Sequence, residues 1–236
     1  MKNSALPALL LAAIFANAAQ AREPNFVTAE QVRAFQILPA PPANDAAQTK
    51  KELAKLHRLE NARTPLQVQA AAADDKDESI FLFRNVMGSS FAEAALPLTA
   101  AFTERVKSDA GGIAAPAKKG FLRPHPYNLD KTLHPICETK IKDDSYPSGH
   151  TFAGYLQALT LIDMVPERRD AILARADDYA HNRMVCGVQY ESDLDASKLL
   201  AYSTFALMAN HPQYQKEMLG ARLELRRVLG LSLAAN

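Results

Sequence analysis

The chain has 236 residues and a formal net charge of +1, from 27 basic and 26 acidic side chains. This length is enough for one domain with a substantial core. Because the charge is nearly balanced, the composition gives no reason to expect a nucleic-acid-binding protein.

The first 21 residues have the pattern of a secretory signal. Lys2 supplies a positive start, residues 9–15 a short apolar run, and Ala19-Gln20-Ala21 a small-residue cleavage site. We therefore expect residues 1–21 to be a signal peptide and residues 22–236 to form a periplasmic or secreted domain. An uncleaved membrane anchor is the alternative. The apolar run is short for a bilayer, however, and no later segment is long enough to span one.

Scarce glycine, abundant alanine and leucine, and the lack of a sustained alternating pattern predict a mostly helical chain. Thr28 is expected to cap a short first helix. Asn44 or Asp45 is expected to cap a longer helix that runs through Glu60 and ends before Pro65.

The rest of the chain divides into further helices and two irregular segments. Residues 70–77 are interpreted as an alanine-rich, acidic connector. Residues 111–146 are interpreted as a loop-rich stretch, because glycine and proline recur along it. The remaining helices are expected at residues 79–86, 96–107, 151–164, 166–185, 192–209 and 212–229.

The tetrapeptide Pro147-Ser148-Gly149-His150 lies between a polar loop and the helix expected from residue 151. Free backbone N–H groups and the helix dipole at such a start favour an anion. The His150 imidazole can exchange a proton near neutral pH. These properties suit phosphoryl transfer, although Pro-Ser-Gly is also a common turn and cap.

Two further blocks flank this one, Ala117 to Tyr127 upstream and Asn182 to Asp193 downstream. Together the three blocks resemble the bacterial class A non-specific acid phosphatases. Those enzymes belong to the superfamily of type-2 phosphatidic acid phosphatases and vanadium haloperoxidases, and their pattern is K-x6-R-P, P-S-G-H, then S-R-x5-H-x3-D. The resemblance extends to residues 38–42, 77–88 and 96–100, so it covers most of the mature chain.

The resemblance implies an all-α fold, a single-domain helical bundle with the site where loops meet helix ends. It implies a phosphomonoester hydrolase of broad specificity that needs no metal or other cofactor. Phosphate or a small phosphomonoester is then the expected ligand, with no nucleic acid and no membrane span. Assembly into a homo-oligomer is left open.

The resemblance also implies roles for individual residues. His150 would protonate the leaving oxygen, and Asp193 would orient the ring of the nucleophile. Phosphate oxygens would be bound by side chains and N–H groups of Lys118, Arg123, His125, Ser148, Gly149 and Arg183. As alternatives, Arg123 also fits a solvated charge, His125 a turn between two prolines, and Asp193 a local cap.

This chain departs from the family pattern at three chemical positions. Gln189 replaces the nucleophilic histidine, His125 an arginine, and Asn182 a serine. In the family an imidazole attacks phosphorus and forms a phosphohistidine, which is covalent catalysis. A glutamine amide nitrogen has no comparable lone pair, so Gln189 can hydrogen-bond a phosphate oxygen but not attack phosphorus. Whether Gln189 is natural or was introduced to inactivate the protein is open.

Gln189 and Asp193 are four residues apart, so they would share one face if this segment is helical. Two functions follow. The first is an exported acid phosphatase, which the intact Pro147–His150 block and Asp193 support. The second is a phosphate-binding pseudoenzyme, which Gln189 favours.

Cys137 and Cys186 are the two cysteines of the chain, and both lie near motif blocks. Export would supply an oxidising compartment. The blocks must also converge if they hold one phosphate. We therefore predict a disulfide between these cysteines, with two free thiols as the alternative.

Overall fold

The computed structural model describes residues 24–137 and 139–233. Over these residues the chain forms helices and no strand, so the all-α prediction is confirmed. Within the same ranges no helix combines the length and the apolar character needed to cross a membrane. The expected signal peptide, residues 1–21, lies outside the described residues.

The helices follow one another with short connections. In chain order they are α1 (Ala29–Val32), α2 (Ala34–Ile37), α3 (Ala47–Ala62), α4 (Pro65–Asp74), α5 (Arg84–Met87), α6 (Pro97–Phe121), α7 (Pro126–Leu129), α8 (Gly149–Met164), α9 (Arg169–Val185), α10 (Glu191–Met208) and α11 (Pro212–Val228). Short 3₁₀ turns are present at Ile80–Phe83, Glu93–Ala95 and Pro166–Arg168.

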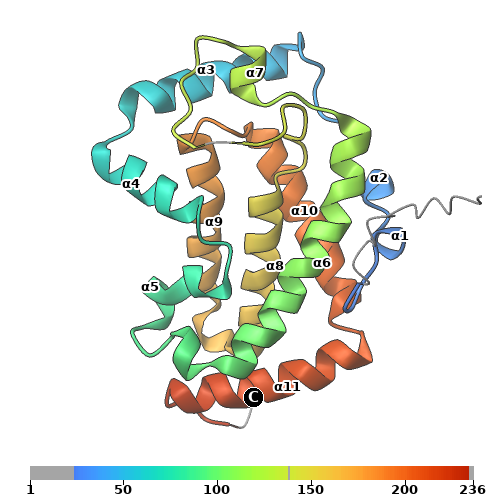
Figure 1. Ribbon diagram of the computed structural model, residues 1–236, viewed down its shortest axis with the longest axis vertical. Helices are drawn as coiled ribbons and strands as arrows, with labels where there is room; N and C mark the ends of the chain where they lie inside the picture. Colours follow the sequence, from blue (N-terminus) through green and yellow to red (C-terminus); the bar gives the residue numbers. More distant parts are fainter. Residues whose placement is uncertain (1–23, 138, 234–236) are drawn as a thin grey trace, which may run out of the picture.

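Helix α8 is the central helix of the bundle and packs against α6, α9 and α10. Most of its residues are buried, which fits its apolar composition on all sides. Figure 1 shows these four helices side by side, with α11 across one end of the bundle and α3 across the other. Because successive long helices alternate in direction, α6 and α9 end where α8 and α10 begin.

The connector expected at residues 70–77 is wrong, because α4 continues through Asp74. Thr64 caps α4 with a reciprocal bond to Gln67, and Pro65 occupies its first position. The alanines that follow are strong helix formers, so nothing stops the helix at residue 70.

The loop expected from residue 111 is also wrong over its first part, because α6 continues to Phe121. The helix passes through three glycines and Pro116, which lower helix propensity. Ile113, Ala114 and Ala117 are buried on this stretch, so packing of one face outweighs the local cost. This extension places Lys118 in the last turn of α6.

The expected cap of the third helix is a smaller error. Neither Asn44 nor Asp45 caps α3, which begins after Ala46 with no side-chain cap bond. In contrast, Thr28 caps α1 as predicted, in a capping box with Gln31.

Helices α8 and α9 approach closely at Gly154. A Cβ atom added there would lie 2.7 Å from Cδ1 of Tyr179. The Tyr179 ring is buried, and its hydroxyl donates to the backbone oxygen of Asp77 at 3.1 Å. The ring therefore has little freedom to move aside.

We expect Gly154→Ala to lower the free energy of unfolding by about 1–3 kcal/mol, the usual cost of overpacking a core. Gly111→Ala is the matched control, because Gly111 lies on the exposed side of α6 with no atom within 4 Å of the added Cβ. That change should raise stability by about 0.5–1 kcal/mol through helix propensity. Urea denaturation measures both, and equal effects of the two substitutions would contradict the packing argument.

Candidate functional site

The candidate residues meet at the end of the bundle where α6 and α9 end and α8 and α10 begin (Figure 1). Lys118 lies in the last turn of α6 and Arg183 in the last turn of α9. Ser148 caps α8, and Asp193 lies in the first turn of α10. The motif blocks are thus brought together by helix ends.

The start of α8 forms one wall of the site. The Ser148 hydroxyl accepts a hydrogen bond from the N–H of Thr151 at 3.4 Å. A Cβ atom added at Gly149 would lie 3.7 Å from Cε of Lys118, so the lysine side chain passes alongside this helix start. The lysine and the helix dipole both favour an anion here.

Arg183 and His150 are held by the segment that follows α4. The Arg183 guanidinium is buried and forms a salt bridge with Asp75. Its Nε–H has no hydrogen-bond partner among the described residues. Nε2 of His150 lies 3.2 Å from the backbone oxygen of Asp75 and 3.0 Å from Oε1 of Glu78. A buried donor without a partner is costly, so the Nε–H of Arg183 is suited to a ligand oxygen.

The ionisation of His150 follows from this position. Burial and the positive charge of Arg183 lower the pKa of His150, and the Glu78 carboxylate partly opposes that shift. The protonated imidazole therefore becomes common only at acid pH. A step that needs a proton from His150 should be faster there.

Lys118 and His125 share one partner, Asp144. Nζ of Lys118 donates to the backbone oxygen of Asp144 and lies 3.4 Å from its Oδ2. Nδ1 of His125 donates to the oxygen of Val188 at 2.6 Å, and its Nε2 lies 2.9 Å from Oδ1 of Asp144. Both ring nitrogens thus face oxygen atoms, a backbone carbonyl and a carboxylate. His125 is thus a buried member of the site and not a surface turn residue.

Asp193 is the fully buried carboxylate of the site. Its carboxylate accepts hydrogen bonds from Oγ of Ser145 and a guanidinium nitrogen of Arg123, both at 2.6 Å, and from the N–H of Tyr190 at 2.9 Å. Burial raises the pKa of Asp193, and the Arg123 charge opposes that effect. The three donors account for a carboxylate at a position with no exposure.

Arg123 lies in a buried network behind the pocket and is not a solvated charge. A second guanidinium nitrogen donates to Oε2 of Glu52 at 3.0 Å. The guanidinium also lies over the Tyr190 ring, 3.8 Å from its centre. Its hydrogen bonds go to Asp193, to Glu52 and to the Ser192 hydroxyl, so it joins the start of α10 to α3.

Gln189 lies in the segment between α9 and α10, because α10 begins at Glu191. The expectation that Gln189 and Asp193 share a helical face is therefore wrong. Gln189 is buried, and its Oε1 has no hydrogen-bond partner in the described part of the chain. It follows Val188, whose backbone oxygen accepts the hydrogen bond from His125.

Sequence reasoning missed the acidic residues that bind the cations: Glu52, Asp75, Glu78 and Asp144. Two signals in the sequence point to some of them. Asp144 precedes the Pro147 block by three residues, Glu78 lies inside the 77–88 segment of the family resemblance, and Asp75 lies two residues before that segment. Glu52 lies in a mostly basic stretch of α3 and has no such signal.

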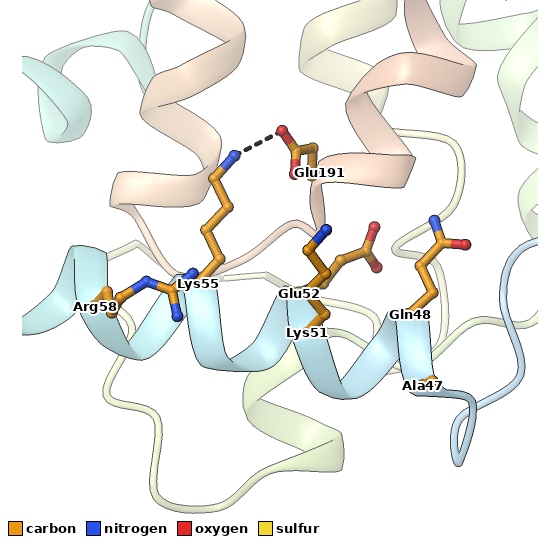
Figure 2. A pocket seen from close by; sticks show the side chains of 7 residues that line it. All are labelled: Ala47, Gln48, Lys51, Glu52, Lys55, Arg58 and Glu191. Carbon is orange, nitrogen blue, oxygen red and sulfur yellow. Dashed lines mark hydrogen bonds and ion pairs between the residues drawn. The ribbon is translucent and has the colours of Figure 1, made fainter.

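A separate pocket of about 430 Å³ lies between α3 and the start of α10. Figure 2 shows Lys55 reaching from α3 to Glu191, where the two side chains form an ion pair of 2.6 Å. Glu52 also lines this pocket and connects it to the buried Arg123 network. None of its lining residues is a candidate from the sequence, so we place the site at the helix ends and not here.

Asn182 stands at the position of the family's serine. Its side-chain nitrogen donates to Oδ2 of Asp74 at 2.7 Å. Arg175 binds the same carboxylate through two hydrogen bonds, of 2.5 and 3.1 Å. Asn182 therefore helps to fasten α4 to α9, which places Asp75 next to Arg183.

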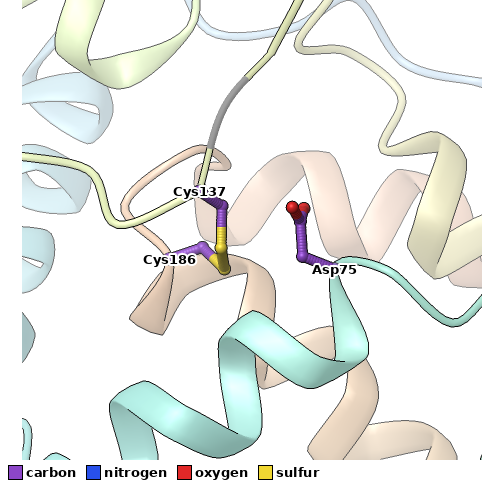
Figure 3. A group of neighbouring side chains, drawn as sticks. All are labelled: Asp75, Cys137 and Cys186. Atoms are coloured by element: carbon purple, nitrogen blue, oxygen red, sulfur yellow. A yellow bond between two sulfur atoms is a disulfide. The ribbon is translucent and has the colours of Figure 1, made fainter.

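Cys137 and Cys186 are bonded, with an S–S distance of 2.02 Å and their Cα atoms 5.2 Å apart. Figure 3 shows the bridge beside Asp75, and the ligand atoms of these three residues lie within 4.8 Å of one another. Both sulfurs are used in the disulfide, so neither offers a thiolate to a metal. The bridge joins the loop before Pro147 to the end of α9, which carries Arg183.

Comparisons with known proteins give relatives over most of the chain, although no family model matches it. The chain is 33% identical to a non-specific acid phosphatase of Salmonella typhimurium, over 88% of this chain and 86% of that protein. It is 34% identical to a non-specific acid phosphatase of Salmonella typhi (83% and 81%) and 28% identical to one of Providencia stuartii (84% and 83%).

A similar solved structure is the first transmembrane PAP2 type phosphatidylglycerolphosphate phosphatase from Bacillus subtilis. The TM-score is 0.50 at 15% identity, over 68% of this chain and 84% of the other. At this identity the likeness concerns the fold alone.

We expect mass spectrometry of non-reduced peptides to show Cys137 linked to Cys186. Their sequence separation is 49, and closing a loop of that size is worth roughly 4 kcal/mol in the chain-entropy model. Reduction should therefore lower the melting temperature, whereas a Cys137→Ala/Cys186→Ala variant should show no change on reduction. Free thiols in freshly exported protein would refute the bridge.

Proposed function

The chain belongs to the non-specific acid phosphatase family, and from this premise we propose that it binds phosphomonoesters at the helix-end site and hydrolyses them slowly, without a phosphohistidine. The observation that carries the proposal is the set of cationic and N–H donors gathered at the start of α8. Lys118, Arg183 and the helix start contribute to it, and Arg183 has a buried N–H with no partner among the residues that the structure describes.

These donors match the chemistry of phosphoryl transfer, in which charge is spread over the non-bridging oxygens. Positively charged side chains and fixed N–H groups that neutralise this charge lower the barrier without any covalent intermediate. Arg183 offers planar N–H donors to two oxygens, and Lys118 offers a compact charge. Gln189 can donate an amide N–H to a further oxygen.

With Gln189 in place of the nucleophile, we propose direct attack by water. The water oxygen bonds to phosphorus, the bond to the ester oxygen breaks, and His150 gives its proton to that leaving oxygen. The water gives up a proton to solvent. Hydrolases that lose their nucleophile keep about 10³–10⁴-fold catalysis over water through binding and charge stabilisation alone, so a slow rate is the expected outcome.

The second candidate is a phosphate-binding pseudoenzyme, which the Gln189 amide favours. A chromogenic phosphate ester assayed from acidic to neutral pH separates the two candidates. Turnover that is lost in Arg183→Ala supports the slow hydrolase. Binding of phosphate without turnover supports the pseudoenzyme.

We further propose that the protein works in the periplasm or outside the cell. The signal pattern of residues 1–21 supports export. The Cys137–Cys186 bridge also supports it, because disulfides persist in oxidising compartments.

Inorganic phosphate should raise the melting temperature, because a ligand of the folded state stabilises it. At a hundredfold excess over the Kd the gain is about 2.7 kcal/mol, or roughly 5–10 °C for a chain of this size. Arg183→Ala should remove most of the shift. Arg169→Ala is the control, because Arg169 is exposed and pairs with Asp170 on the surface. A wild-type protein that does not respond to millimolar phosphate would contradict the proposed pocket.

Gln189→His should raise the hydrolysis rate by about a hundredfold or more, because the covalent route reopens. Gln189→Asn keeps an amide and should give no increase. Adding His125→Arg to Gln189→His should increase the rate further, since it restores the family's cation. Steady-state kinetics with the chromogenic ester measures all three. Equal rates for the histidine and asparagine variants would contradict the proposal that a missing nucleophile limits hydrolysis.

The pH profile of the Gln189→His variant gives a second readout. The pKa of His150 is lowered from its ordinary 6.5, so its general-acid form is gained as pH falls through the lowered value and lost as pH rises. We therefore expect kcat to rise toward acid pH. His150→Ala should flatten this limb for a substrate with a poor leaving group.

A further inference from the structure

Among the residues that the structure describes, Asp144 is the one acid whose carboxylate contacts two of the candidate phosphate-binding side chains, Lys118 and His125. One carboxylate oxygen lies 3.4 Å from Nζ of Lys118, and the other lies 2.9 Å from Nε2 of His125. The Lys118 and His125 side chains are largely buried, whereas about a quarter of the Asp144 side chain is exposed. The acid therefore reaches into the site from its outer side.

The location of this carboxylate coincides with the place proposed for phosphate. Lys118 passes alongside Gly149 at the start of α8, and His125 is bound to the residue before Gln189. A carboxylate between these two side chains presents two negatively charged oxygens to the donors that phosphate oxygens would use. The Asp144 carboxylate thus occupies donors that the oxygens of a bound phosphate would use.

Asp144 also has the freedom to leave. It lies in the segment between α7 and α8, outside any helix. Its neighbour Ser145 is buried and bonded to Asp193, so the backbone stays anchored on one side while the Asp144 side chain can rotate outward. Rotation would take the carboxylate away from both Lys118 and His125, whereas Nζ of Lys118 would keep its bond to the Asp144 backbone oxygen.

We infer that Asp144 is a specificity-determining residue that competes with the phosphate group for Lys118 and His125. The inference rests on the proposed function, since it concerns the same pocket. A tethered carboxylate competes at an effective concentration of about millimolar or higher. Weak anions therefore fail to enter, and a phosphomonoester dianion binds only after it displaces the acid. The apparent affinity for the phosphomonoester is the intrinsic affinity multiplied by the fraction of molecules in which Asp144 has left Lys118 and His125.

Arg183 differs from these two cations. Its partner Asp75 takes one guanidinium nitrogen, but the Nε–H stays without a partner in the described part of the chain. Arg183 can thus make first contact with an anion while Asp144 is still in place. Loss of Asp144 should leave this contact unchanged and add the other two.

The test compares Asp144→Asn with the wild type by calorimetric titration with inorganic phosphate at neutral pH. The asparagine keeps the shape and removes the charge, so phosphate should bind about tenfold more tightly if the pocket is closed by Asp144 in nine molecules of ten. Asp143→Asn is the matched control. Asp143 is the residue next to Asp144, is exposed, and takes part in none of the ion pairs of the described residues. This variant should bind like the wild type. Asp144→Glu keeps the charge and should stay close to the wild type.

Three results would overturn the inference. Equal phosphate affinity in the wild type and Asp144→Asn, with binding lost in Arg183→Ala, refutes the competition and leaves the proposed function standing. Absence of phosphate binding in all variants refutes the proposed function and the competition with it. A lower kcat at unchanged phosphate affinity would instead make Asp144 a base for the attacking water. Asp144→Ser serves as a second variant, and circular dichroism verifies that both variants are folded.

Discussion

The site depends on one buried carboxylate, Asp193. Its carboxylate accepts hydrogen bonds from Ser145 in the loop before α8, from Arg123 in the segment after α6, and from Tyr190 at the start of α10. Its backbone oxygen accepts a further hydrogen bond from the N–H of Ser148 at the start of α8. Arg123 extends the connection to Glu52 on α3. Removal of one partner from such a buried ion network costs about 3–5 kcal/mol, because a charge is left without compensation. The network therefore fixes the relative positions of the helix ends that surround the pocket.

The cations of the pocket have acids of the same chain as partners. Asp144 binds Lys118 and His125, and Asp75 binds Arg183. Burial of cations without a partner is unfavourable, so these acids stabilise the site when no anion is bound. The same contacts reduce the affinity for an anion, because the ligand has to replace them. In the proposed phosphate site, the stability of the site without a ligand and its affinity for phosphate are therefore opposed.

We propose that Gln189 removes the covalent route, whereas the hydrogen bonds around Asp193 are in place. Asp193, which the family resemblance assigns to orienting an imidazole, keeps its bonds to Ser145 and Arg123. The Gln189 side chain is buried in the segment before α10. A pocket that retains its donors while it lacks the nucleophile can still bind and stabilise charge. This separation of binding from covalent chemistry is the basis of both candidate functions.

The sequence by itself determined the helical class, most of the helices and the family. These features depend on local propensity, on caps such as Thr28 and on short motifs, all of which act within a few residues. It also indicated the pairing of Cys137 and Cys186, because the chain has no other cysteine. The length of α6 was beyond local reasoning, since burial of one face decides whether a helix survives glycine and proline.

Only the tertiary structure decided which acid binds which cation. Arg123 is 70 residues from Asp193 and 71 residues from Glu52. An ion pair over such a distance leaves no pattern in the sequence, because its energy depends on burial and on separations of a few ångströms. For this reason the basic residues of the site could be named from motifs, whereas the cation that each of Glu52, Asp75 and Asp144 binds could be found only after the helices were packed.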